Sequence, residues 1–128
     1  MTRKVIRTDQ APKAVGPYSQ ATLIEGTLYC SGQVAIDPKD NSFIGGSVGQ
    51  QTKQVLTNLK AVLTEAGMSL SDILKTTIYL QDISDFGEVN EIYATFFQEP
   101  YPARVTIQAG ALPLNALVEI DAIARKDR

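Results

Sequence analysis

The sequence contains 128 residues, of which 44% are hydrophobic, and its formal net charge is −2 with a pI near 5.0. This length predicts one domain over residues 1–128, and the acidic balance disfavours nucleic acid or an anionic membrane surface as a partner. Cys30 is the single cysteine and there is no histidine, which excludes disulfide frameworks, Cys/His zinc sites and every nucleophile that depends on a histidine base.

The first third of the chain predicts short strands and loops. The charged N-terminal segment lacks an apolar run long enough for a signal peptide, and no window approaches a membrane span, so we expect a soluble, cytoplasmic protein. Val5 and Ile6 predict a short strand, and the prolines of residues 8–21 predict an irregular loop. Residues 21–34 then form two apolar runs around Glu25-Gly26, which indicates a hairpin.

Two helices are predicted in the rest of the chain. Ser47 and Gln50 form the pattern of a capping box, apolar residues follow at helical spacing from Val55 onward, and Gly67 supplies a stop. A second apolar stripe runs through residues 85–97 and ends before two prolines. Between the helices, alternation predicts a strand with one face made of Leu74, Thr76, Ile78 and Leu80.

The last two predicted strands complete the sheet. They cover Arg104–Ala109 and Leu117–Ala124 and flank the loop of residues 110–115. Five or six strands and two helices of ordinary length favour an α+β fold, in which both helices cover one face of a mixed sheet.

Alternation assigns a face to each residue of these two strands. In the last strand, the set predicted to face the helices is Val118, Ile120, Ala122 and Ala124, and the set predicted to face away is Leu117, Glu119, Asp121 and Ile123. The outward set is half apolar, which suits a subunit interface better than open water. In the strand before it, Val105, Ile107 and Ala109 are predicted to point inward, and Arg104, Thr106 and Gln108 outward. Arg104 and Glu119 are therefore predicted to share one outer face that another subunit partly buries.

Arg104 and Glu119 are the strongest candidates for chemistry. A guanidinium at the start of a strand presents a rigid fork that matches a carboxylate or phosphate, so Arg104 is a candidate anchor for an anionic substrate. The alternative is exposure or a structural ion pair with Glu119 or Asp121. Glu119 would become a base or a water-orienting group if it were partly buried near an arginine, whereas a lone carboxylate on a strand is more often solvated or paired.

Further candidates carry weaker signals. Tyr18 follows a Gly-Pro pair that could project its phenol over a pocket, although packing of the ring is the commoner role. Gly32 after Ser31 indicates a bulge, a tight bend or a close backbone approach to a ligand. Asn90 lies in the second predicted helix, where an asparagine is ordinarily exposed or capping. Cys30 is better explained as a small buried hydrophobe than as a nucleophile.

Taken together, five segments resemble the RidA/YjgF family, which is also called the translation-inhibitor or perchloric-acid-soluble family. They are GPYSQA (16–21), SGQV (31–34), VNEIYATFF (89–97), PARVTI (102–107) and LPLNALVEIDAIA (112–124), in that order along essentially the whole chain. The resemblance implies a homotrimer of chorismate-mutase-like subunits with three sites in the clefts between subunits. It also implies hydrolysis of 2-aminoacrylate and 2-iminobutanoate, released by pyridoxal-phosphate-dependent dehydratases, to 2-keto acids and ammonia, without a cofactor or metal.

The same resemblance implies roles for the candidate residues. Arg104 would bind the substrate carboxylate, and Glu119 would orient or activate the attacking water. Tyr18 would line the pocket, the Ser31-Gly32 segment would contribute backbone groups, and Asn90 would make a polar contact. This chemistry fits the composition, because an iminium carbon is already electrophilic and needs a placed water more than a histidine or a metal.

One position departs from part of the family, and two other functions stay open. Where many members have a cysteine two residues after the arginine, this chain has Thr106, which leaves a backbone contact but no thiol. A non-catalytic module that binds small carboxylates would need Arg104 but not Glu119. A ribonuclease that inhibits translation is the least favoured function, because the pI is acidic and no basic-aromatic stripe is present. The strand pattern leaves open whether Arg104 faces Glu119 within one subunit or across an interface.

Overall fold

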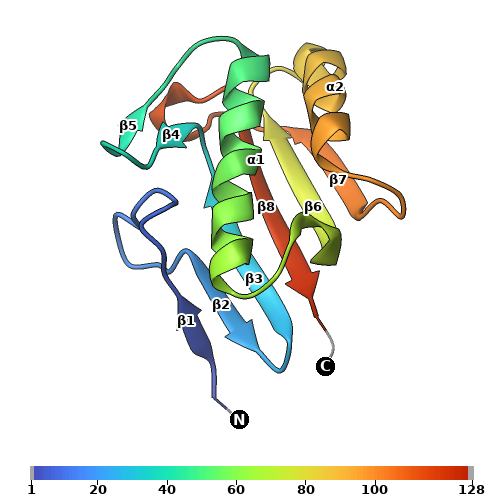
Figure 1. Ribbon diagram of the computed structural model, residues 1–128. Coiled ribbons are helices and arrows are strands. Elements are labelled where there is room, and N and C mark those ends of the chain that lie inside the picture. Colours follow the sequence, from blue (N-terminus) through green and yellow to red (C-terminus); the bar gives the residue numbers. More distant parts are fainter. Residues whose placement is uncertain (1, 127–128) are drawn as a thin grey trace.

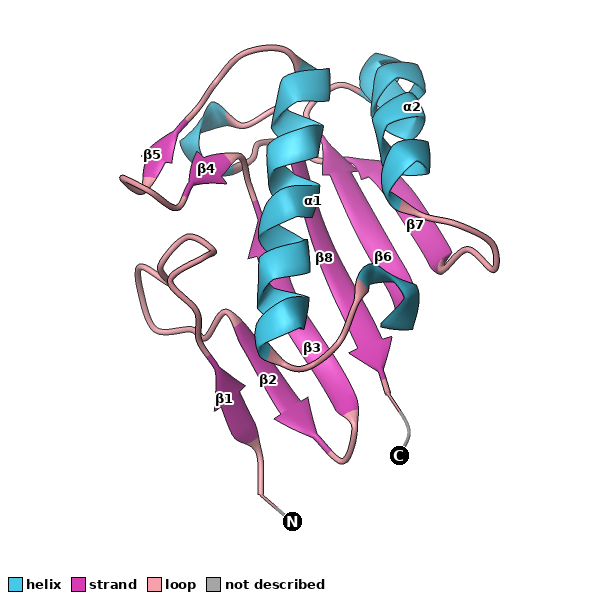
Figure 2. Ribbon diagram, in the orientation of Figure 1, coloured by secondary structure: helices cyan, strands magenta, loops and turns pink. Residues whose placement is uncertain are grey.

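The computed structural model describes residues 2–126 and contains a six-stranded sheet with two long helices on one face (Figures 1 and 2). The strand order is β1-β2-β3-β8-β6-β7. Neighbouring strands are antiparallel except for β6 and β7, which run parallel. The predicted α+β fold, with a mixed sheet and both helices on one face, is confirmed.

The predicted hairpin, helices and final strands all form. The strands of the sheet are β1 (Lys4–Ile6), β2 (Ala21–Ile24), β3 (Thr27–Gln33), β6 (Ile73–Leu80), β7 (Ala103–Gln108) and β8 (Val118–Arg125). The helices are α1 (Val48–Glu65) and α2 (Phe86–Phe96). A two-stranded ribbon of β4 (Ile36–Asp37) and β5 (Ser42–Phe43) precedes α1, and the short 3-10 helices are η1 (Leu70–Asp72), η2 (Ile83–Asp85) and η3 (Pro113–Asn115).

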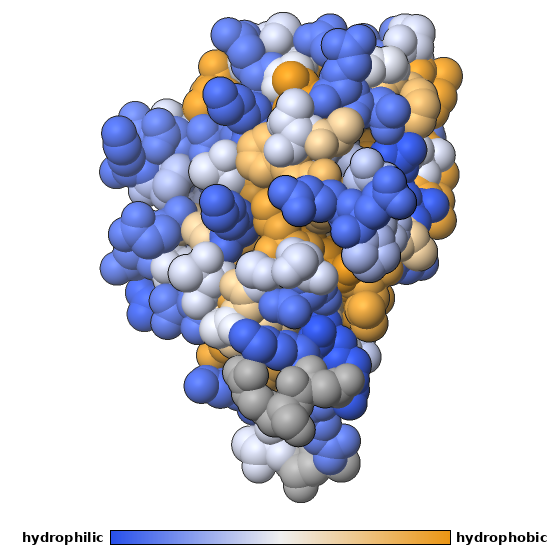
Figure 3. Space-filling view, turned by 45° about the vertical axis from the view of Figure 1, so that its right-hand side comes forward, coloured by the Kyte–Doolittle hydropathy of each residue, from blue (hydrophilic) through white to orange (hydrophobic). Residues whose placement is uncertain are grey.

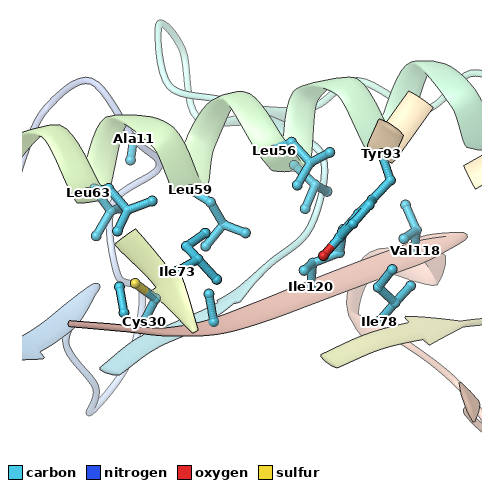
Figure 4. Close-up of a cluster of buried hydrophobic side chains, with 14 of the residues drawn as sticks. Ala11, Cys30, Leu56, Leu59, Leu63, Ile73, Ile78, Tyr93, Val118 and Ile120 are labelled. Carbon is cyan, nitrogen blue, oxygen red and sulfur yellow. The ribbon is translucent and has the colours of Figure 1, made fainter. Parts of the chain in front are cut away.

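Helix α1 begins and ends where its sequence predicts. The Ser47 hydroxyl accepts a hydrogen bond from the Gln50 amide at 3.1 Å, and the Gln50 side chain accepts one from the Ser47 amide at 2.9 Å, which completes the capping box. After the helix, Gly67 adopts a φ of 76°, a left-handed conformation that favours glycine. Leucines on the inner face of α1 pack onto the sheet beside Ile120 of β8 (Figure 4), so the core lies between this helix and the central strands.

Helix α2 connects the two parallel strands β6 and β7 and packs beside α1 (Figure 1). Its buried residues are Val89 and Tyr93, and the Tyr93 hydroxyl lies 2.8 Å from the Thr76 hydroxyl of β6. A register shift between Ile73 and Lys75 leaves Leu74 exposed, so Ile73, and not Leu74 as predicted, joins the core. The tyrosine therefore fixes α2 against the strand that lies next to β7.

The alternation of β8 is as predicted from Val118 onward, whereas Leu117, predicted to face away from the helices, precedes the strand and packs against the core. The opposite face of the sheet is partly apolar. Val118, Ile120, Ala122 and Ala124 are buried under the helices, while Glu119, Asp121 and Ile123 are half-buried on the uncovered face. Tyr29, Val105 and Ile107 are 50%, 44% and 43% exposed. Figure 3, which turns the side of α2 and β7 forward, shows a further stripe of hydrophobic surface between polar side chains. An uncovered sheet face of this kind is typical of a surface that another chain covers.

The predicted faces of β7 are wrong. Arg104 pairs with Thr76, and Thr106 pairs with Ile78, and both partners are buried under the helices. Because paired residues point to the same side of a sheet, Arg104 and Thr106 lie on the helix-covered face, and Val105 and Ile107 lie on the uncovered one. The reason is that β7 is an edge strand whose uncovered side is the more apolar. Arg104 and Glu119 therefore lie on opposite faces of the sheet.

Candidate functional site

Helix α2 fixes the guanidinium of Arg104. Arg104 Nη1 donates a hydrogen bond of 2.8 Å to Asn90 Oδ1. The guanidinium carbon lies 5.0 Å from the ring centroid of Tyr93 and 5.3 Å from that of Phe86, within the range of cation–π attraction. These three α2 residues are spaced four and three apart, so they share one side of the helix, the side next to β7. The pairing of Arg104 with Glu119 or Asp121, left open by the sequence, does not occur within the chain.

A cavity opens beside this arginine. It has a volume of about 480 Å³ and is lined by Asn90, Tyr93, Ala94, Tyr101, Pro102 and Arg104. Burial raises the pKa of Tyr93, so its phenol stays neutral and the guanidinium is the charged group of the cavity. Asn90 engages one of the five N–H donors of the fork, which leaves a planar cation held in one orientation. Such a site is suited to a small carboxylate or phosphate.

Glu119 lies on the uncovered face, beside a bulge in β3. The pairing of β3 with β8 shifts register between Cys30 and Gln33, so Ser31 and Gly32 form the bulge. A Cβ atom at Gly32 would overlap Glu119 Oε2 and lie 3.0 Å from its Cδ. The glycine therefore makes room for the Glu119 carboxylate. The sequence left open a bulge, a tight bend or a close approach to a ligand at Gly32. The structure shows a bulge, and the group that approaches Gly32 is a side chain of the same chain.

Two physical causes make the Glu119 carboxyl a better proton acceptor than an ordinary glutamate. Burial is the larger cause and the charge of Asp121 is the smaller one, and both raise the pKa of Glu119 above its usual value. A carboxylate with this tendency could take a proton from water during a reaction and return it.

Tyr18 lies in the loop next to the Ser31 bulge. The Ser31 hydroxyl donates to the Ser19 carbonyl at 2.6 Å, and the Ser31 amide donates to the Gln20 carbonyl at 3.0 Å. Tyr18 itself is 54% exposed, so its ring is not the packed aromatic residue that was the commoner alternative. The buried Gln20 side chain holds this loop through the backbone of Thr8 and Pro12, at distances from 2.7 to 3.0 Å.

The structure groups the predicted residues into two sets and keeps the sets apart. The arginine set comprises Arg104, Asn90 and Thr106, on the helix-covered side of β7 and on α2. The glutamate set comprises Glu119, Gly32, Ser31 and, through the loop, Tyr18. Strands β8 and β6 separate β3 from β7, and the sheet itself separates Arg104 from Glu119.

Sequence reasoning missed the groups that support these two sets. Tyr93 and Phe86 belong to an apolar stripe, and only the position of α2 beside β7 reveals them as partners of Arg104. Tyr79 Oη donates to Asp121 Oδ2 at 2.9 Å on the uncovered face. Alternation places both residues on that face, but the pairing of β6 with β8 is needed to bring them together.

Cys30 is buried under the helix layer, as predicted for a small hydrophobe. Burial, and secondarily the charge of Asp121, raises the pKa of its thiol to about 12.

Within residues 2–126, no helix has the length and apolar character to cross a membrane. The same range holds no group of three His, Cys, Asp or Glu side chains arranged to bind a metal ion.

Comparisons with known proteins match the chain over nearly its full length. Residues 8–126 match the family model of endoribonuclease L-PSP. The chain is 50% identical to the mouse (Mus musculus) 2-iminobutanoate/2-iminopropanoate deaminase over 95% of this chain and 90% of that protein. The crystal structure of RidA from the Antarctic bacterium Psychrobacter sp. PAMC 21119 has a TM-score of 0.93 and 43% identity, covering 96% of this chain and 99% of that one. E. coli TdcF with bound serine has a TM-score of 0.92 and 38% identity, covering 97% and 99%.

Proposed function

The chain belongs to the endoribonuclease L-PSP family, the RidA/YjgF family that its motifs resemble, and on this premise we propose that it is an imine deaminase. The proposed reaction is the hydrolysis of small 2-imino acids, such as 2-iminobutanoate, and of the related enamine 2-aminoacrylate to 2-keto acids and ammonia. The observation that carries the proposal is the Arg104 fork, held by Asn90 and two aromatic rings at the wall of a small cavity.

Arg104 acts in this proposal as the substrate anchor. A carboxylate on the remaining N–H donors would form a bidentate pair, which fixes both the position and the plane of the substrate. The adjacent imine carbon is then held at one place relative to the protein, and such fixation replaces the entropy loss of a random encounter. Thr106 lies next on the same face of β7, where its backbone would contact the substrate.

Glu119 acts in this proposal as the general base and general acid for the attacking water. It takes a proton as water adds to the iminium carbon and forms the new C–O bond, and it passes that proton to the nitrogen. The carbinol oxygen then loses its proton to Glu119 as the C–N bond breaks, which gives the 2-keto acid and ammonia. Glu119 passes this second proton to the ammonia, so that ammonium leaves and the carboxylate is restored. General acid–base help of this kind is worth about 10²-fold to 10⁴-fold. Tyr18 and the Ser31-Gly32 bulge border the same half of the site.

The complete site is proposed to form between subunits of a homotrimer. A small substrate cannot contact Arg104 and Glu119 of the same chain, because they lie on opposite faces of the sheet. A second copy could supply the missing half by covering the uncovered face, where Tyr29, Val105 and Ile107 are exposed. The oligomer would thus be part of the catalytic machinery.

The test is the rate of 2-keto acid release from 2-iminobutanoate, generated by a threonine dehydratase with semicarbazide as trap. We expect the wild type to accelerate release and Arg104→Ala to lose this activity while keeping its oligomeric state by light scattering. Arg104→Lys is the matched control, because it keeps the charge without the fork and should recover only part of the rate. A fully active Arg104→Ala variant would refute the anchor role.

A second candidate is a module that binds small carboxylates without turnover. It is favoured by one observation, the bound serine in the related TdcF structure. Glu119→Gln separates the two functions, because a binding module keeps its affinity for a 2-keto acid, whereas a deaminase loses rate far more than affinity.

A further inference from the structure

The neighbours of Glu119 on the uncovered face form an ordered arrangement that has no role in the reaction as described above. Tyr79 of β6 is the direct cross-strand partner of Glu119 in β8. Its phenol does not bond to Glu119 but donates to Asp121 Oδ2 at 2.9 Å, the diagonal position within reach of an aromatic side chain. Asp121 is thus held at a fixed place two residues along the strand, about 7 Å from Glu119 measured along the backbone.

We propose that Asp121, anchored by Tyr79, is a positioning residue for Glu119: its fixed negative charge makes the Glu119 carboxylate a stronger proton acceptor during imine hydrolysis. The inference rests on the proposed deaminase function, and it assigns a role that the reaction needs. A glutamate of ordinary acidity is a weak base at neutral pH, and a second carboxylate on the same face opposes its negative charge.

Among the charged groups near Glu119, Asp121 is the one placed to oppose its negative charge. On the strands packed against β8, the other ionisable groups of the uncovered face are Lys75 and Tyr79 of β6 and Tyr29 of β3, and β8 itself ends in Arg125. Lys75 pairs with Ile123 and is one position farther from Glu119 than Asp121 is. Edge strand β7 presents Ala103, Val105 and Ile107 on this face, none of them ionisable. Within one chain, Asp121 is therefore the anion nearest to Glu119 on this strand, and the cations of β6 and β8 lie beyond it. In the proposed assembled site, Arg104 of a second copy is the cation that would face Glu119.

Tyr79 keeps its hydrogen bond to Asp121 because its phenol stays protonated. The hydrogen bond to Asp121 raises the pKa of Tyr79, so the phenol stays protonated and continues to donate. Burial of Glu119, and secondarily the charge of Asp121, raises the pKa of Glu119 in the same direction. On the β3 side of Glu119, Gly32 has no side chain and so leaves room for the carboxylate.

A direct test measures protonation of Glu119 itself. The chain has six glutamates, so NMR titration of protein labelled with carboxyl ¹³C in glutamate gives a small set of signals, and Glu119→Gln identifies the one that is wanted. Asp121→Asn is expected to move the midpoint of Glu119 to lower pH, and Asp121→Glu to restore it. Glu65→Gln, which removes one charge from the far side of α1, should leave the midpoint unchanged. Asp121→Ser replaces Asp121→Asn if the latter does not fold.

Activity provides the second measurement. Asp121→Asn is expected to lower kcat by about threefold to tenfold on the high-pH plateau and to shift the acid limb of the profile to lower pH, with KM little changed. A purely structural role would change melting temperature or assembly without moving the Glu119 midpoint. A Glu119 midpoint that is the same in wild type and Asp121→Asn overturns the inference. Failure of the wild type to release 2-keto acid counts against the deaminase, whereas the NMR midpoint decides the role of Asp121 by itself.

Discussion

Gly32→Ala adds a single methyl group next to Glu119, in the glutamate set of site residues. The added Cβ would overlap Glu119 Oε2 and lie 3.0 Å from Cδ and 3.2 Å from Cγ, whereas ordinary contact begins at 3.4 Å. The carboxylate must therefore move by about an ångström, and a displacement of this size costs roughly 100-fold in rate, or about 2.7 kcal/mol of transition-state stabilisation. The loss should appear mainly in kcat, because the carboxylate anchor of the substrate is untouched.

The fold should tolerate this change. Gly32 is not among the residues with positive φ, so the backbone accepts alanine, and alanine loses less conformational freedom than glycine on folding. Gly87→Ala is the matched control, because a Cβ at Gly87 meets open space. Steady-state kinetics on 2-iminobutanoate should show a large loss in Gly32→Ala alone, with both variants melting at or above the wild-type temperature. Wild-type kcat in Gly32→Ala would refute the positional role of Glu119.

Three further outcomes are expected. Because the pKa of Glu119 is raised in the folded chain, the unfolded chain loses the Glu119 proton first as the pH rises, and native stability falls between the unfolded and folded pKa values. In calorimetry, Glu119→Gln should therefore melt above wild type at pH 7 and at the same temperature as wild type near pH 3. Cys30, whose pKa is raised to about 12, should react with a chromogenic disulfide reagent only after unfolding in guanidinium, and a rapid native reaction would contradict its burial. Asn90→Ala removes the 2.8 Å hydrogen bond to Arg104 and should lower kcat/KM about tenfold, chiefly through KM; an unchanged KM would show that the bond does not orient the fork.

The elements of this fold are readable from local sequence because their signals are local. The capping box of Ser47 and Gln50 sets the start of α1, and the hairpin turns at Glu25-Gly26, where both residues adopt positive φ. The face of β8 is also readable, since one of its alternating sets is wholly apolar and the other contains Glu119 and Asp121.

The face of β7 could not be read in the same way. Alternation separates Arg104 from Val105 but does not say which set meets the helices, and apolar character alone predicts that Val105 faces the core. At an edge strand that another chain can cover, this prediction fails: Val105 and Ile107 are exposed, and Arg104 meets the polar and aromatic side of α2. The parallel pairing of β6 with β7 is a long-range feature. The contacts that hold Arg104 and its separation from Glu119 can therefore be seen only in the structure.

Subunit complementation tests the central claim, a deaminase site shared between two copies of the chain. Arg104→Ala and Glu119→Gln are each expected to be nearly inactive on 2-iminobutanoate. When equal amounts are unfolded together and refolded, random assembly should place a wild-type arginine opposite a wild-type glutamate in about a quarter of the sites. The account predicts about a quarter of the activity of refolded wild type, and a mixture no more active than the separate variants would contradict it.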